Sequence, residues 1–139
     1  MAEGQIRVRL VSPERILVDE MADAVEIPSK TGYLEVLYGH APLLAEVGAG
    51  EVRLHGGNTA EEKYSVARGF VEVLPDRVTI LAESAERIEE IDVAAAQEQL
   101  QRGEQMWNDA GEDAEKYAQA NEVMAEATAK LESAGVGNH

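Results

Sequence analysis

The residues in this sequence best suited to metal or acid–base chemistry are its three histidines, His40, His55 and His139. A zinc site needs nitrogen, sulfur or carboxylate ligands at short, characteristic spacings along the chain. No two of these histidines have such a spacing, none belongs to a His-Glu-x-x-His pattern, and the chain has no cysteine. The sequence therefore predicts no metal centre, and it places His40 and His55 in turns or at strand ends.

Other catalytic and cofactor-binding patterns are missing as well. No glycine-rich phosphate-binding loop joins a strand to a helix, and no Gly-x-Ser-x-Gly elbow presents a nucleophilic serine. Gly48-Ala49-Gly50 lies between two predicted strands and is interpreted as a hairpin turn. The acidic pairs Glu61-Glu62 and Glu89-Glu90 fit a solvated surface better than a catalytic carboxylate pair. We therefore expect no cofactor and a non-catalytic protein that binds other proteins.

The charge balance excludes further classes of partner. The 139 residues include 12 Lys and Arg and 27 Asp and Glu, for a net charge of −15. Nucleic-acid binding and adhesion to anionic membranes both need a basic surface. The first residues lack the basic and apolar regions of a signal peptide, and no apolar run approaches the ~20 residues of a membrane span. We expect a soluble, cytoplasmic chain.

The elements that position these residues change in character near residue 86. Before it, short runs alternate between apolar and polar residues, as at Ile6, Val8 and Leu10, and turn residues separate the runs. This pattern predicts about ten short strands in an all-β sandwich or barrel over residues 1–86. The clearest runs lie at 5–11, 15–19, 23–27, 33–37, 43–47, 51–55, 63–67, 70–74 and 77–82.

Residues 87–139 have a helical period instead. Two apolar stripes at 3-4 spacing flank a polar turn at 108–113, and together they predict an antiparallel two-helix hairpin. Asp92 is placed to cap the first helix. The stripes are rich in alanine, so the hairpin is weakly held, either as a movable element or as a marginal one. The packing residues are Val93, Ala96, Leu100, Gly103 and Trp107 in the first helix and Tyr117, Ala120, Met124, Ala127 and Leu131 in the second.

Several segments, in this order and spacing, resemble the epsilon subunit of bacterial F-type ATP synthases. The most distinctive is Gly32 to Leu44, which includes Gly39-His40-Ala41-Pro42. The similarity runs nearly from end to end. The other segments are Val11 to Arg15, Gly69 to Ala82, Ala85 to Arg87, Ile91-Asp92 and Tyr117 to Ala120.

The resemblance implies a ten-stranded β-sandwich followed by a two-helix domain. It also implies a non-catalytic rotor subunit that binds the gamma subunit, rests on the ring of c subunits, and couples proton translocation to ATP synthesis. Such a subunit lies at the cytoplasmic face of the bacterial inner membrane. Tyr38 stands where the family usually has proline. The residues implied to contact the ring are Lys30, Thr31, Gly32, Tyr33, Tyr38, Gly39 and His40.

Two further family properties are expected to be weak here. Many members bind ATP through an Ile/Leu-Asp-x-x-Arg-Ala motif, but Ala95 stands where the arginine should be, although Glu86 and Asp92 match its acidic positions. Acids without a guanidinium do not hold a triphosphate, so we expect negligible ATP affinity. The family hairpin also inhibits the alpha/beta catalytic head. Residues 86–139 carry a net charge of −9, so inhibition should be weak or should depend on Met106 and Trp107.

Two alternatives from other classes remain. A free-standing β-sandwich adaptor with a helical interaction hairpin would have the same composition and the same change of period. An acid-dependent enzyme or a divalent-cation binder is the least favoured, because the sequence shows no ligand constellation.

Overall fold

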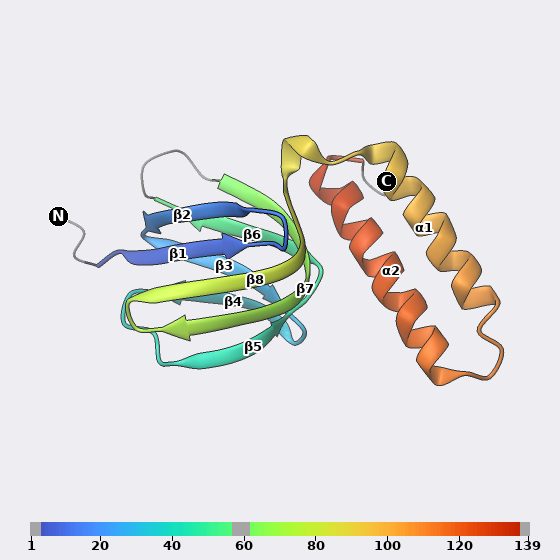
Figure 1. The fold of residues 1–139 in the computed structure, drawn as a ribbon, viewed down its shortest axis with the longest axis horizontal. Helices are drawn as coiled ribbons and strands as arrows, with labels where there is room; N and C mark the ends of the chain where they lie inside the picture. Colours follow the sequence, from blue (N-terminus) through green and yellow to red (C-terminus); the bar gives the residue numbers. More distant parts are fainter. Residues whose placement is uncertain (1–3, 57–61, 137–139) are drawn as a thin grey trace. The chain divides into compact units, whose positions relative to one another are not determined.

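The computed structural model describes residues 4–56 and 62–136, which form two compact units that divide between Arg87 and Ile88 (Figure 1). The first unit is made of strands. They are β1 (Ile6–Val11), β2 (Ile16–Ala22), β3 (Ala24–Ser29), β4 (Gly32–Leu37), β5 (Leu43–Val47), β6 (Gly50–His55), β7 (Glu62–Leu74) and β8 (Arg77–Arg87).

The second unit is helical. It contains the short 3-10 helix η1 (Ile88–Glu90) and the helices α1 (Val93–Asn108) and α2 (Ala114–Ser133). No helix in the described part of the chain combines the length and the apolar character needed to cross a bilayer.

The eight strands form one hydrogen-bonded sheet that folds over on itself into a sandwich. Seven strands follow the order β2-β1-β8-β7-β5-β3-β4, and β6 pairs with both β3 and β7. The long strand β7 joins the two layers, because its first half pairs with β6 and its second half pairs with β5. Figure 1 shows the pronounced curvature of β7 and β8. All pairs are antiparallel except β1 with β8, which run parallel.

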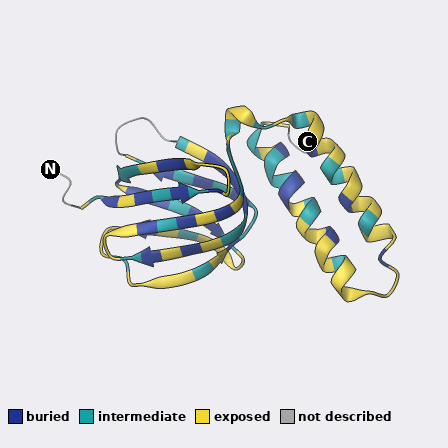
Figure 2. Cartoon of the chain, in the orientation of Figure 1, coloured by how far each residue is buried: buried dark blue, intermediate teal, exposed yellow. Residues whose placement is uncertain are grey.

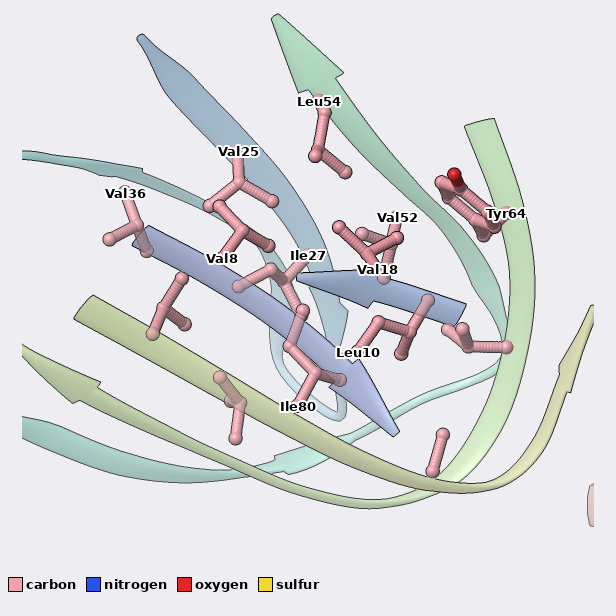
Figure 3. Packing of buried hydrophobic residues seen from close by; sticks show 14 of the residues in the cluster. Val8, Leu10, Val18, Val25, Ile27, Val36, Val52, Leu54, Tyr64 and Ile80 are labelled. Atoms are coloured by element: carbon pink, nitrogen blue, oxygen red, sulfur yellow. The ribbon is translucent and has the colours of Figure 1, made fainter. Parts of the chain in front are cut away.

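Alternating side chains of the strands build the core between the layers, as predicted. Ile6, Val8 and Leu10 of β1 are fully buried, whereas Arg7 between them is exposed. Figure 2 shows the same alternation along most strands, and Figure 3 shows the aliphatic side chains converging between the layers. The cluster consists almost entirely of Val, Ile and Leu, so its stability comes from the hydrophobic effect.

The number of strands differs from the prediction: eight are present among the described residues, not about ten. The predicted runs at 63–67 and 70–74 are one continuous strand, β7, whose pairing with β8 keeps the same register on both sides of Arg68. Arg68 has φ of 58° and Gly69 has φ of 149°, so neither residue has ordinary strand geometry. A Cβ on Gly69 would overlap the carbonyl oxygen of Leu81 on β8. The two residues therefore distort the strand without ending it.

The interpretation of Gly48-Ala49-Gly50 as a hairpin turn is wrong. Strands β5 and β6 both pair with β7, end to end, and no pairing between them is present. The Gly48 amide donates to the carbonyl of Pro28 at 2.9 Å, and a Cβ on Gly48 would lie 3.0 Å from the Ser29 carbonyl oxygen. Glycine is needed here because the chain crosses between layers in close contact with β3.

The helical unit is the predicted hairpin. Asp92 caps α1, accepting a hydrogen bond from the Ala95 amide at 3.0 Å, and Asp113 caps α2 in the same way. Gly111 in the turn has φ of 64°. The predicted stripes meet, with Ala96, Gly103, Ala120, Ala127 and Leu131 buried and Val93, Leu100, Tyr117 and Met124 partly buried. Trp107 is 41% exposed, and its ring packs edge-on against Tyr117 with centroids 4.5 Å apart.

Gly103 marks the closest approach of the two helices, and this predicts a large effect of enlarging it. A Cβ at this position would lie 2.5 Å from Cγ of Met124 and 3.2 Å from its backbone nitrogen. Gly103→Leu is expected to destabilise the hairpin by about 2 kcal/mol through overpacking. Urea unfolding followed by fluorescence of Trp107, the single tryptophan, reports on this unit directly. Arg102→Leu, at an exposed neighbouring position, is the control, and equal midpoints for the two variants would contradict the prediction.

Candidate functional site

An exposed row of apolar side chains crosses the outer face of the sandwich on four adjacent strands. Phe70 on β7 pairs with Leu81 on β8, Leu81 pairs with Val11 on β1, and Val11 pairs with Ile16 on β2. Phe70 and Leu81 are each 53% exposed and Ile16 is 55% exposed. Because these residues are neighbours in register, they form one continuous strip, which we call the apolar row.

Polar side chains border the apolar row on both sides. On one side Glu72, Thr79, Arg9 and Asp19 form the next cross-strand row, with Arg9 and Asp19 3.7 Å apart. On the other side Arg68 lies 3.7 Å from Glu83. An apolar centre with a polar rim is the arrangement typical of a protein–protein interface.

Sequence reasoning missed the apolar row, although a signal for it was present. In regularly alternating strands, outward positions should be polar, yet Phe70 and Leu81 are outward and large. That each is apolar could be read from the sequence. That they are neighbours depends on the β7–β8 register, which no local pattern in the sequence specifies.

The first predicted contact loop, at 29–33, is a tight turn between β3 and β4. The Ser29 hydroxyl donates to the Gly32 carbonyl, and the Thr31 amide donates to that hydroxyl at 3.3 Å. The Lys30 amide is held by the Glu46 carbonyl at 3.2 Å. Hydrogen bonds therefore hold in place the turn that carries Lys30, Thr31 and Gly32.

Tyr33 has a structural role in addition to its exposure. Its hydroxyl accepts a hydrogen bond from the Glu51 amide at 3.0 Å, and the guanidinium of Arg53 lies 5.2 Å from its ring centre. Arg53 also forms ion pairs with Glu51 at 2.9 Å and Glu26 at 3.2 Å. The ring thus covers the start of β6, while half of its surface remains available to a partner.

The second predicted contact loop, at 38–41, is fastened to the turn between β7 and β8. The Gly39 amide donates to the Pro75 carbonyl at 2.7 Å, and the His40 amide donates to the Leu37 carbonyl at 3.1 Å. Nδ1 of His40 lies 2.7 Å from the Ala41 carbonyl oxygen. The side chain of Tyr38 is 56% exposed.

The structure does not bring the two loops together. Strand β4 runs from one loop to the other, so they lie at its opposite ends (Figure 1). Six residues of strand span roughly 20 Å. β4 pairs only with β3 and forms one edge of the sheet. A single contact that includes both loops must therefore run along the β4 edge.

The side chains considered for metal or nucleotide binding do not form a common site among the described residues. In the described ranges no three His, Asp or Glu side chains are grouped to hold a metal ion, and His139 and Glu61 lie outside those ranges. His55 Nε2 lies 3.6 Å from Glu26, whose carboxyl pKa is lowered chiefly by its hydrogen bond with Arg53. This network is an ion-pair layer on the outer face of β3 and β6.

Asp92, the central acidic residue of the incomplete nucleotide-binding motif, has a structural role. The Asp92 carboxylate is occupied by capping α1, Ala95 is exposed in the first turn, and Glu86 pairs in register with Ser65 on β7. We expect isothermal titration calorimetry of the full chain with ATP to show no binding. The Ala95→Arg variant is the informative control, since any gain in affinity would report the missing guanidinium alone. A dissociation constant in the low micromolar range for the natural chain would contradict the prediction.

Comparisons with known proteins agree with this architecture. The family model for the β-sandwich domain of the ATP synthase delta/epsilon chain matches residues 5–88, and the model for its long α-helix domain matches residues 89–135. The ATP synthase epsilon chain of Koribacter versatilis is 51% identical over 105 residues, which cover 73% of this chain and 71% of the relative. That of Moorella thermoacetica is 38% identical over 132 residues, covering 95% and 98%.

A solved structure shows the same fold. A chain of the Euglena gracilis mitochondrial ATP synthase, in an OSCP/F1/c-ring assembly, superimposes with a TM-score of 0.75 at 22% identity and covers 94% of this chain and 81% of that chain. The two family models together account for nearly all of the described residues, and the Moorella relative is similar over almost its full length. The chain therefore belongs to the ATP synthase delta/epsilon chain family.

Proposed function

We propose that this chain is a non-catalytic rotor subunit of the central stalk of an F-type ATP synthase. In this role it turns with the gamma subunit and couples proton translocation to ATP synthesis at the cytoplasmic face of the bacterial inner membrane. The observation that carries the proposal is the apolar row, which offers a surface for a stable partner in a chain of this family. The sandwich serves as the docking domain and the hairpin as a regulatory one.

The apolar row is the surface we assign to the gamma subunit. Phe70, Leu81 and Ile16 are each about half exposed, and covering them removes apolar area from water at roughly 25 cal/mol per Å². The chain carries a net charge of −15, so a contact built mainly on apolar area avoids the repulsion that acidic surfaces would bring. The polar rim then fixes the orientation of the complex.

The β4 edge is the surface we assign to the ring of c subunits. The turn with Lys30 and Thr31 lies at one end of this edge, and Tyr38 and His40 lie at the other end. Backbone hydrogen bonds hold one end to β5 and the other to the turn between β7 and β8, so little conformational freedom is lost when a partner binds. A stiff contact of this kind suits the transmission of torque.

The hairpin is assigned a regulatory contact with the alpha/beta catalytic head, and we expect that contact to be weak. Residues 86–139 carry a net charge of −9, which opposes docking on acidic surfaces. Deleting residues 87–139 from the assembled enzyme is expected to raise ATP hydrolysis by less than about twofold. Steady-state ATPase assays on matched assemblies measure this, and a many-fold activation would contradict the charge argument.

Co-expression with the gamma subunit of the same organism tests the proposed function. We expect a stable one-to-one complex by size-exclusion chromatography with light scattering. The alternative, a free-standing adaptor, predicts that the chain stays separate from gamma and elutes alone or as a homo-oligomer.

A further inference from the structure

Two partly buried carboxyl groups lie close together at an edge of the sandwich. Glu20 lies on β2 between the buried residues Val18 and Ala22, on the side of the strand that faces the core. Glu62 is the first residue of β7 and pairs in register with Leu54. The carboxyl groups of Glu20 and Glu62 lie close enough for one to donate a hydrogen bond to the other when it carries a proton. Strand β2 ends the strand order and pairs only with β1, so this contact is a second attachment for it.

The oxygen atoms of this pair need a proton. Oε1 of Glu20 and Oε2 of Glu62 are both buried, and neither has a hydrogen-bond donor among the described residues. Carboxylate oxygens only accept hydrogen bonds, so two ionised carboxylates in contact repel each other and leave buried acceptors unpaired. One proton converts one carboxyl into a donor and the other into its acceptor. Burial, then the hydrogen bond with Glu62 and its charge, raise the pKa of Glu20 to about 7.

No charged group among the described residues donates to Oε1 of Glu20 or to Oε2 of Glu62. From β7, Tyr64 lies beside it, 4% exposed, and its pKa is raised chiefly by burial and also by the charge of Glu62. From β8, Arg87 forms a hydrogen bond with Tyr64. From β1, Val8 lies opposite Glu20, while Arg7 is on the outer face and donates to Asp19 at 2.9 Å.

We propose that Glu20 and Glu62 form a proton-binding site that fastens edge strand β2 to the start of β7, and that losing the proton loosens this edge of the sandwich. The direction of the effect follows from linkage. A glutamate in the unfolded chain titrates near its ordinary value of 4.5, whereas the folded chain keeps the shared proton up to about pH 7. The folded state therefore binds more protons in that interval, and the free energy of unfolding falls as the pH rises through it and levels off above it.

Carboxyl titration by ¹³C NMR on the full chain tests the proposal. We expect one glutamate, assigned to Glu20, to titrate near pH 7. In the Glu62→Gln variant the titration midpoint of Glu20 should move toward the ordinary range of a glutamate, because the amide of the new side chain donates a hydrogen bond and carries no charge. If every assigned glutamate titrates below about pH 5.5, the proposal is overturned.

Urea unfolding and amide hydrogen exchange test whether the contact between Glu20 and Glu62 stabilises β2 at the edge of the sandwich. The urea concentration at the unfolding midpoint of the natural chain is expected to fall from pH 5 to pH 8. The protection of β2 amides against hydrogen exchange is expected to drop about tenfold or more between pH 6 and pH 8. Glu20→Gln should flatten both trends. Glu72→Gln, on the exposed face of β7, is the matched control and should keep them. Equal slopes in these two variants would overturn the proposal. Should Glu20→Gln fail to fold, the titration of the natural chain decides alone.

Discussion

Leu81→Glu is expected to weaken the complex with the gamma subunit by at least about 100-fold. Leu81 lies in the middle of the apolar row, paired with Phe70 on one side and Val11 on the other. A carboxylate at this position would be buried without a partner when the complex forms, and that costs several kcal/mol. The free chain should fold normally, because more than half of this side chain already faces water. Surface plasmon resonance on immobilised gamma measures the change.

The control for this prediction is Leu37→Glu. Leu37 is also large, apolar and about half exposed, but it lies at the end of β4, away from the apolar row. Its substitution should leave the affinity for gamma unchanged, and circular dichroism should show both variants folded. If Leu81→Glu binds gamma as tightly as Leu37→Glu does, the apolar row is not the interface, and the proposed function loses the observation that carries it.

Gly69→Ala is expected to destabilise the sandwich by about 3 kcal/mol or more. Gly69 has φ of 149°, a conformation that side chains rarely adopt, and a Cβ there would overlap the Leu81 carbonyl oxygen and lie 2.9 Å from Cα of Ala82. Both obstacles are backbone atoms of β8, so relief requires the β7–β8 ladder to separate. Thermal or urea unfolding followed by far-ultraviolet circular dichroism measures the loss.

Gly39→Ala is the matched control because it separates backbone strain from the clash. Gly39 also has a positive φ, of 90°, but nothing lies within 4 Å of a Cβ built there. Its substitution should cost only the conformational penalty, about 1–2 kcal/mol. Equal losses for the two variants would show that the clash with β8 contributes nothing.

Much of the fold could be predicted from the sequence, because local periodicity reports burial directly. Val78, Ile80 and Ala82 alternate with outward residues and are buried as predicted, and Asp92 caps the helix that follows it. The strand count was wrong because Arg68 and Gly69 interrupt the alternation without interrupting the strand. Residues with positive φ can mark a turn or a distortion within a strand, and only the pairing with the partner strand distinguishes the two cases.

The candidate sites depend on which strands pair and in what register, so they were harder to predict from the sequence. No local pattern places Glu20 against Glu62, since 41 residues lie between them in the sequence. The acidic pair containing Glu62 was interpreted as solvated surface. In the same way, the two contact loops are close in sequence, yet β4 holds them apart. Sequence neighbours can thus be distant in the fold, and register determines which side chains act together.

The parallel pairing of β1 with β8 has a consequence for biosynthesis. The ladder from Arg7↔Arg77 to Val11↔Leu81 joins the beginning of the sandwich to its last strand, so β1 waits for about 70 further residues to be translated before its second neighbour exists. Until β8 has left the ribosomal exit tunnel, the nascent chain has an open strand edge and an uncovered aliphatic surface. Stable closure is therefore a late event in translation, and the helical hairpin is the stretch of chain whose synthesis carries β8 clear of the tunnel.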